Sequence, residues 1–428
     1  MIQTAATVRR TYYVLTAGNT LAASLIWGIN TIFLLDAGLT NFEAFAANAF
    51  YTAGMVLFEI PTGVVADSRG RRTSFLWGTV TLAVATGLYV LLWQLHASFG
   101  WWAVVSVLLG LGYTFFSGAT EAWLVDALTE TKFDGMLEAV FSRGQVVGGV
   151  FMLLGSVAGG YLAQLTNLGI PYVARAGILL IMFVLALIMM RDLGFSPDRG
   201  TGPVAEIKKI VHNSVTYGLK VSAIRNTMIS GVFAGGVGVY VFYALQPHLL
   251  DLWGNPEAYG IAGLVAAIIS GAMITGGLIT PFIRRRFTRR TSALLFLAAL
   301  GLVPLALIGL LDNFWVVVGL IVLWGLADAA AEPIRRAYLN GMIPSAQRAT
   351  ILSFDSLFSS AGGIVAQPAL GRSADLYGYK TSYLISAAAS ALALPFLFLA
   401  RRAADPADRE IAVPAPEDEP KSPNQVDA

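Results

Sequence analysis

The chain has 428 residues, of which 56% are hydrophobic and only 13% are charged, roughly half the charged fraction of an ordinary soluble domain. Together with a mean hydropathy of +0.68, this composition excludes a soluble globular protein and indicates a polytopic membrane protein. The formal net charge of +2 excludes nothing by itself, and the absence of cysteine leaves the redox compartment open.

Apolar runs long enough to cross a bilayer must be helices, because hydrocarbon offers no partner for free backbone N–H and C=O groups. In chain order, six such runs occupy residues near 13–36, 42–66, 73–95, 99–126, 139–165 and 170–191. Six more lie near 226–251, 257–283, 291–311, 314–340, 348–370 and 379–400. The predicted fold class is therefore an all-α integral membrane protein with 12 transmembrane helices in two six-helix bundles.

The charged and polar stretches divide the chain into four regions. Residues 1–191 are expected to form the N-terminal bundle and residues 226–402 the C-terminal bundle. Residues 192–225 form a polar connector with an amphipathic pattern, and we expect a cytoplasmic helix there. Residues 403–428 are rich in Pro, Asp and Glu and are expected to be a disordered tail.

The distribution of Lys and Arg predicts the orientation. With 12 spans and an inside N-terminus, 25 of the 28 Lys and Arg residues fall on the cytoplasmic side. Only Arg175, Arg372 and Lys380 fall outside. Because basic residues favour the cytoplasmic side of a membrane, we expect both termini in the cytoplasm and the protein in the cell inner membrane.

The loop between the second and third spans carries the most specific motif. Gly63 and Asp67 end the second span, and Gly70, Arg71 and Arg72 open the third. Gly70 permits a tight reversal, and a carboxylate at the end of a span can accept N–H groups at the start of a neighbouring helix. A weaker copy of this pattern follows in the second half, at Gly277 to Arg286, which is typical of a transporter built from two repeats. A third match, Gly371 to Lys380, falls outside by the span count and is interpreted as an ordinary helix end and turn.

Residues 63–74 resemble the loop signature of the major facilitator superfamily, and the resemblance extends over about residues 10–402. Residues 58–63, 117–126 and 348–354 resemble its bacterial drug/proton antiporter (multidrug efflux) branch. The resemblance implies alternating access, with a cytoplasmic gate latched by Asp67 and Arg71 and with Asp126 as the partner of Arg71. The alternative is that these charges only set the topology.

Two further groups of residues bear on proton coupling. Gly155, Gly159 and Gly160 in the fifth span resemble the antiporter glycine signature with Ser156 in place of proline, although the same pattern also suits plain helix packing. Asp328 and Glu332 in the tenth span share a helix face, and together with Glu121 in the fourth span they are candidate proton carriers. The other interpretation is that Glu332 pairs with Arg335 or Arg336.

By the same resemblance, the first, fourth, seventh and tenth spans line a central cavity. Aromatic and polar side chains on three of these spans are candidates for contacting a bulky apolar solute: Asn19, Trp27, Asn30, Tyr113, Tyr240, Tyr243 and Gln246.

The expected function is export of small lipophilic or cationic molecules, drugs or metabolites, in exchange for protons. A nutrient symporter, a uniporter and a non-transporting sensor are the alternatives. The sequence has neither metal-ligand spacing around its histidines nor a phosphate-binding lysine loop, so no enzyme activity, metal, cofactor or nucleic acid is expected. The expected partners are a small-molecule substrate, protons and the lipid bilayer, and the protein is expected to be monomeric.

Overall fold

The computed structural model describes residues 4–116, 118–195, 197, 219–343 and 348–409. The first half of the chain forms α1 (Ala5–Trp27), α2 (Asn30–Asp36), α3 (Asn41–Arg69), α4 (Arg71–Gln94), α5 (Phe99–Thr114), α6 (Ala119–Glu130), α7 (Leu137–Leu165) and α8 (Gly169–Met189). The second half forms α10 (Ser222–Trp253), α11 (Tyr259–Arg284), α12 (Arg290–Ile308), α13 (Phe314–Met342), α14 (Arg348–Ala391), α15 (Ala393–Arg402) and the 3₁₀ helix η3 (Pro406–Asp408).

The described helices make 12 passes. Ten segments are long and apolar enough to cross a membrane, and the bent pair α1 and α2 adds an eleventh. One of the ten, Ile351–Arg402, is 52 residues long and contains two passes, because Gly378 leaves the helical conformation at φ 78° and ψ 166°. Beyond that break the second part of α14 runs back beside the first part, and the Ser382 hydroxyl donates to the carbonyl of Leu370 at 2.9 Å. The all-helical 12-span prediction is confirmed.

Two of the predicted spans are broken rather than continuous. The first bends by 48° between α1 and α2. The fourth stops at Thr114 and restarts at Ala119, after Gly118 in the left-handed region at φ 69°. Both flanks of each break are apolar, so hydropathy alone does not reveal it.

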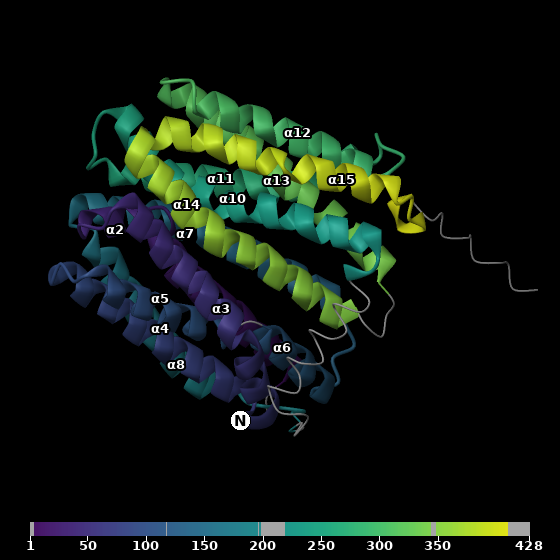
Figure 1. Cartoon of the computed structure of the whole chain (residues 1–428). Helices are drawn as coiled ribbons and strands as arrows, with labels where there is room; N and C mark the ends of the chain where they lie inside the picture. The colour runs from purple at the N-terminus through teal and green to yellow at the C-terminus, as the bar shows by residue number, and fades with distance from the viewer. Residues whose placement is uncertain (1–3, 117, 196, 198–218, 344–347, 410–428) are drawn as a thin grey trace, which may run out of the picture.

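Figure 1 shows two bundles, α1–α8 in the lower half of the view and α10–α15 in the upper half. We call the end that holds Ala5, the α3–α4 turn and Arg402 the terminal end, and the other the opposite end. The bundles meet at the opposite end, where α3 packs against α14 and α7 against α11, and diverge toward the terminal end.

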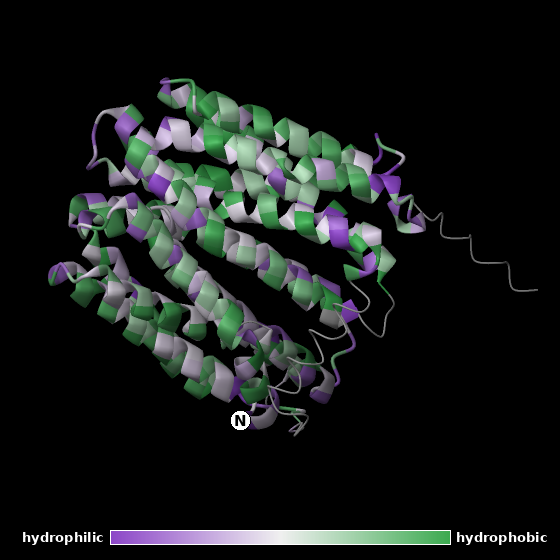
Figure 2. Ribbon diagram, in the orientation of Figure 1, coloured by the Kyte–Doolittle hydropathy of each residue, from purple (hydrophilic) through white to green (hydrophobic). Residues whose placement is uncertain are grey.

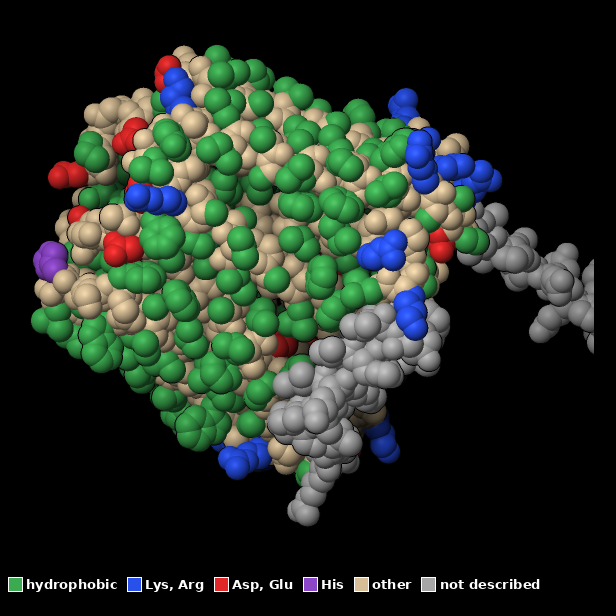
Figure 3. Space-filling model, in the orientation of Figure 1, with side chains coloured by type: hydrophobic (Ala, Val, Ile, Leu, Met, Phe, Trp, Pro, Cys, Tyr) green, Lys and Arg blue, Asp and Glu red, His purple; other side chains and the backbone are tan. Residues whose placement is uncertain are grey.

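The surface fits a lipid environment. Hydrophobic residues cover the middle of the helices, and polar residues gather at their ends (Figure 2). In the space-filling view, apolar side chains dominate the face, and most Lys and Arg side chains lie toward the terminal end (Figure 3).

A carboxylate closes each bundle in the same way. Asp192, just after α8, accepts a hydrogen bond of 2.8 Å from the backbone N–H of Arg72 in the first turn of α4. Asp408, in η3 just after α15, accepts from the N–H of Thr291 at 2.7 Å and from its hydroxyl at 2.8 Å, in the first turn of α12. In each half, a carboxylate just after the last span is therefore hydrogen-bonded to the start of the third span. The two halves share this contact, as expected of a structural repeat.

Asp408 also corrects the predicted start of the tail. Residues 403–409 were assigned to a disordered tail, but they fold back on α12 and α13, and Asp408 is only 2% exposed. Asp408, which follows α15, caps the first turn of α12, and the composition of the tail did not reveal this contact. The rest of the predicted tail, residues 410–428, and most of the predicted connector helix lie outside the described residues.

Candidate functional site

The contact between the bundles at the opposite end is held by a capped helix. The backbone N–H groups of Asn41 and Phe42, which open α3, donate to the two carboxylate oxygens of Asp375 at 2.9 Å each. Tyr379 adds a hydrogen bond to the side-chain oxygen of Asn41. Because a carboxylate at a helix N-terminus satisfies free N–H groups and meets the positive end of the helix dipole, Asp375 joins the second bundle to the first.

The predicted turn between residues 371 and 380 is found at Gly378, but the sequence interpretation did not include the contact that Asp375 makes with the other bundle. The Gly-x-x-x-Asp pattern that begins at Gly371 supplies a carboxylate that caps a helix of the other bundle at the opposite end. The loop motif has the same pattern and could cap a helix in the same way at the terminal end. A methyl group at Gly371 would lie 2.8 Å from the carbonyl oxygen of Asn41, so this glycine also permits the close approach of α3. The motif in the sequence was therefore the signal that could have drawn attention to this contact.

A second inter-bundle cap joins α7 to α11. The side-chain oxygen of Gln164 accepts from the N–H of Gly260 at 2.9 Å. Close to it, a methyl group at Gly160 would lie 2.9 Å from the α-carbon of Gly263.

The three glycines of the fifth span bring helices together. Gly159 faces the backbone of Leu25 in α1, Gly155 faces Ser24 in the same helix, and Gly160 faces α11. This is the packing geometry of small residues between membrane helices, and their role in an antiporter signature stays a prediction.

Gln246 of α10 fills the break in the first span. Its amide nitrogen donates to the carbonyl of Trp27 at 2.7 Å, and its oxygen accepts from the N–H of Thr31 at 2.9 Å. In a continuous helix that N–H would bond to that carbonyl, four residues earlier. One side chain from the second bundle thus replaces a missing hydrogen bond in the first.

The loop motif lies within the first bundle in this conformation. Arg71 forms an ion pair with Asp67, and its Nε lies 4.0 Å from a carboxylate oxygen of Asp126, the predicted partner. Arg72 donates from its guanidinium to the carbonyl of Leu187 at 2.8 Å. Gly70 has φ 102° and ψ 148°, a conformation that favours glycine. The latching role of these residues stays a prediction.

Asp192 packs against the same turn. Its carboxylate is partly buried, and this burial raises its pKa, although the N–H and the charge of Arg72 act in the other direction. A methyl group at Gly70 would overlap the Asp192 carboxylate, whereas Gly63 has open space around it.

The structure separates the candidate proton carriers. Asp328 keeps exposed surface and lines a cavity of about 110 Å³ inside the second bundle, between α10, α12, α13 and the last span. Glu332 accepts a hydrogen bond of 2.5 Å from Nε of Arg336, which is one of the pairings expected as an alternative. Glu121 lies exposed in the first turn of α6, in the other bundle.

Arg335 is a second charged residue that lines that cavity. It lines the same space as Asp328 and forms an ion pair with Asp355, which is 7% exposed. Among the described residues, no ion pair or hydrogen bond is found for the Asp328 side chain.

The predicted cavity residues divide into two groups. Asn19, Trp27, Tyr113 and Tyr243 keep accessible surface. The other three are buried in structural contacts: Asn30 bonds to Asn48 and Tyr172, Tyr240 bonds to Ser382, and Gln246 bridges the break described above. Their polar groups already have protein partners in this conformation, and their contact with a solute stays a prediction.

One charged side chain inside the membrane span was missed. Arg175 was counted on the outer side from its sequence position, but it lies near the start of α8 and points into the protein, where it is partly buried. The sequence reveals the charge but not the direction of the side chain.

The chain matches the family described as Major Facilitator Superfamily over residues 12–366 and again over residues 260–425. It is 24% identical to "Multidrug resistance protein MdtG" of Proteus mirabilis (strain HI4320), covering 76% of this chain and 77% of that protein. It is 21% identical to "Uncharacterized MFS-type transporter YxaM" of Bacillus subtilis (strain 168), covering 88% of this chain and 92% of that protein.

Solved structures share the fold at low sequence identity. The nucleoside transporter NupG superposes with a TM-score of 0.74 at 13% identity, covering 92% of this chain and 98% of that one. A bacterial homolog to the human lysosomal transporter Spinster, in an inward-facing and occupied conformation, gives a TM-score of 0.69 at 15% identity, covering 95% and 98%. The protein is thus a membrane transporter and not an enzyme, and the chain belongs to the Major Facilitator Superfamily.

Proposed function

We propose that this protein exports small lipophilic molecules across the cell inner membrane by alternating access, in exchange for protons. The observation that carries the proposal is the arrangement of the bundles, which are bonded together at the opposite end and diverge at the terminal end. A substrate could enter such a molecule from one side only. Closing the terminal end and opening the other would complete a transport cycle.

The charge distribution supports an orientation for this cycle. The terminal end carries most of the Lys and Arg residues, so we propose that it faces the cytoplasm, with both termini there. The conformation described is then open to the cytoplasm. The multidrug resistance relatives support export rather than uptake. The aromatic side chains of Tyr113, which is exposed, and of Trp27 and Tyr243, which are partly buried, support lipophilic substrates.

Asp328 is the best-supported proton carrier of the three candidates. It has no cation partner among the described residues, and a carboxylate inside a span is costly to keep ionised without one. Glu332 already pairs with Arg336 at an exposed position, so its protonation has less effect on the interior.

The loop motif supports a gate at the terminal end. When that end closes, the carboxylate of Asp67 would accept hydrogen bonds from the backbone N–H groups in the first turn of a helix in the other bundle. Asp375 makes the same kind of contact with α3 at the opposite end.

The test is proton movement in liposomes that contain the purified protein, an imposed pH gradient and an internal pH dye. Lipophilic drugs, anionic, neutral and cationic, are added one at a time, and we expect some of them to trigger proton flux. Asp328→Asn should abolish this flux, whereas Asp312→Asn, which alters an exposed ion pair with Lys380 at the opposite end, should not. Equilibration of a labelled drug without proton movement would instead favour a uniporter and overturn the antiport proposal.

A further inference from the structure

Arg175 is a positive charge inside a membrane span. It lies in the second turn of α8, a span with a mean hydropathy of 2.4. An arginine stays protonated under physiological conditions, so it cannot remove the cost of burial by losing its proton. Charges in such a place normally face a partner or a functional site.

The described part of the protein offers Arg175 no anionic partner. None of the ion pairs among the described residues includes Arg175, and its Nε is buried without a hydrogen-bond partner. A second donor in the same region, Nδ2 of Asn48, is also buried without an acceptor.

The titratable groups within electrostatic range of Arg175 are tyrosines and not carboxylates: Tyr51 of α3, Tyr89 of α4, Tyr172 of α8 and Tyr243 of α10. These helices come from both bundles, so the site lies where the two halves meet. Neutral hydroxyl groups can orient toward a cation, but they leave its charge uncompensated.

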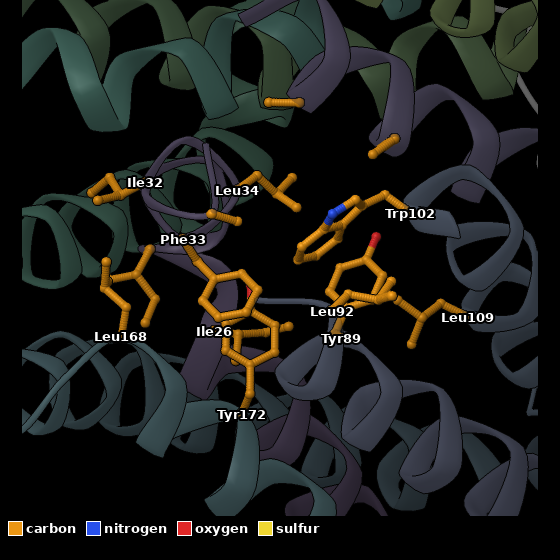
Figure 4. Close-up of a cluster of buried hydrophobic side chains, with 14 of the residues drawn as sticks. Ile26, Ile32, Phe33, Leu34, Tyr89, Leu92, Trp102, Leu109, Leu168 and Tyr172 are labelled. Atoms are coloured by element: carbon orange, nitrogen blue, oxygen red, sulfur yellow. The ribbon is translucent and has the colours of Figure 1, made fainter. Parts of the chain in front are cut away.

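A rigid aromatic cluster holds one side of this site. The rings of Phe33 and Tyr172 stack with their centres 4.0 Å apart, and Tyr89 lies edge-on to Trp102 at 4.9 Å (Figure 4). The Tyr172 hydroxyl donates to Asn30 at 3.0 Å, and Asn30 donates to Asn48 at 3.0 Å. These contacts fix α8 and α3 around Arg175.

The other side of the site is reachable. Arg175, Tyr51 and Tyr243 each keep part of their surface accessible. Tyr113, which is 49% exposed, lies 6.2 Å from Tyr51 between ring centres and extends the aromatic wall. A ligand could therefore place an apolar aromatic body between these rings and an acidic group beside Arg175.

We propose that Arg175 binds the anionic group of the transported substrate, so that the protein takes lipophilic organic acids carrying a carboxylate or a similar oxyanion. This proposal rests on the proposed transport function and defines its substrate class. The missing negative charge comes with the ligand, and the two unpaired donors, Nε of Arg175 and Nδ2 of Asn48, supply hydrogen bonds to it.

The test compares three probes with one aromatic body and different charges: 2-naphthoate, the neutral 2-naphthamide and the cationic 2-naphthylmethylamine. Their binding to the purified full-length protein is measured by calorimetry. We expect naphthoate to bind at least about tenfold more tightly than the other two, because a charge-assisted hydrogen bond is lost with each of them. Arg175→Gln should remove that preference, Arg175→Lys should keep part of it, and Arg286→Gln, which removes an exposed charge at the terminal end, should leave it unchanged.

Thermal unfolding checks that the variants are folded and gives a second readout. The unpaired charge is a cost in the empty protein, so Arg175→Gln should unfold at the same or a higher temperature than the wild type. Naphthoate should raise the unfolding temperature of the wild type but not that of Arg175→Gln.

Either of two results would overturn the proposal: naphthoate binding no better than the amide or the amine, or full naphthoate affinity in Arg175→Gln. Failure of the transport proposal is a separate outcome. In that case naphthoate would bind with the predicted dependence on Arg175, while the protein would move no compound across a liposome membrane faster than it crosses protein-free liposomes.

Discussion

Asp375 bonds to two backbone N–H groups of the other bundle, and charged acceptors make stronger hydrogen bonds than neutral ones. Asp375→Asn keeps an oxygen but removes the charge, so we expect the closed opposite end to lose about 1 kcal/mol. Since the chain has no cysteine, spin labels can be attached to cysteines introduced at Leu95 and Leu310, exposed positions of the two bundles at that end. The distance distribution should shift toward longer values.

Asp312→Asn is the matched control for that measurement. Asp312 lies at the same end, but its ion pair with Lys380 stays within one bundle. An equal shift in both variants would show that surface charge, rather than the cap on α3, controls the opposite end.

Gly70 offers a second test on one residue. Its φ of 102° disfavours any side chain, and a methyl group there would overlap Asp192. We expect Gly70→Ala to lower the free energy of unfolding by about 1–2 kcal/mol, seen as a lower unfolding temperature. Gly63→Ala, in open space within α3, should leave that temperature equal or higher. Equal effects of the two substitutions would contradict this account.

The sequence predicted some residues of the site better than others. The contact between Arg71 and Asp126, which the family resemblance implied, is found at 4.0 Å. Asp375 was set aside because the span count put it on the other side of the membrane, yet helix capping works at either end. Arg175 was assigned to a side by its sequence position, which does not tell whether a side chain points inward.

At the level of helices, the break between α1 and α2 depends on a side chain from the other half. Gln246→Leu removes both hydrogen bonds that Gln246 makes across that break. We expect the first span to regain its own hydrogen bond and the opposite end to open more often. A cysteine introduced at Ala262, which is 2% exposed, should then react faster with a water-soluble maleimide.

Gln94→Leu makes the same chemical change at an exposed position near the same end. It should leave the labelling rate unchanged. If Gln246→Leu also leaves that rate unchanged, the bridge across the break does not hold the bundles together.

The spans themselves were predictable, and their interruptions were not. Apolar runs fix where a helix crosses a membrane, so the predicted boundaries agree with most helix ends to within a few residues. The breaks near Gly28 and Gly118 lie inside such runs. They are stabilised by tertiary contacts that no single segment encodes, such as that of Gln246.

Across the whole molecule, the two halves share their internal ties but differ where they meet. Asp192 and Asp408 play the same part in the two bundles. The inter-bundle caps differ, because Asp375 carries a charge and Gln164 does not. The repeat could be predicted from the loop motif. For the caps, the sequence offers only the Gly-x-x-x-Asp pattern at Gly371 and does not show which helix is capped, because each cap joins residues more than 90 positions apart.

In each bundle, the end of the last span is thus bonded to the start of the third span before the chain leaves the bundle, so we expect the two bundles to assemble without a covalent link. Residues 1–205 and 206–428, produced as two polypeptides in one cell, should assemble into a protein that co-purifies and transports. Asp192→Ala should impair the split protein more than the intact chain, because the end of α8 is then no longer covalently linked to the second bundle. Failure of the two pieces to associate would contradict this view.

The tie between Asp408 and Thr291 has one more consequence. Ala5 and Arg402 lie at the terminal end, as do Met189 and Ser222, the last residue of α8 and the first of α10. The fold therefore does not impose the order of the halves along the gene. A circular permutant that starts with the second bundle, with the old ends joined by a flexible linker, should insert with the same orientation. For this architecture, a gene that encodes the two bundles in either order would yield the same folded transporter.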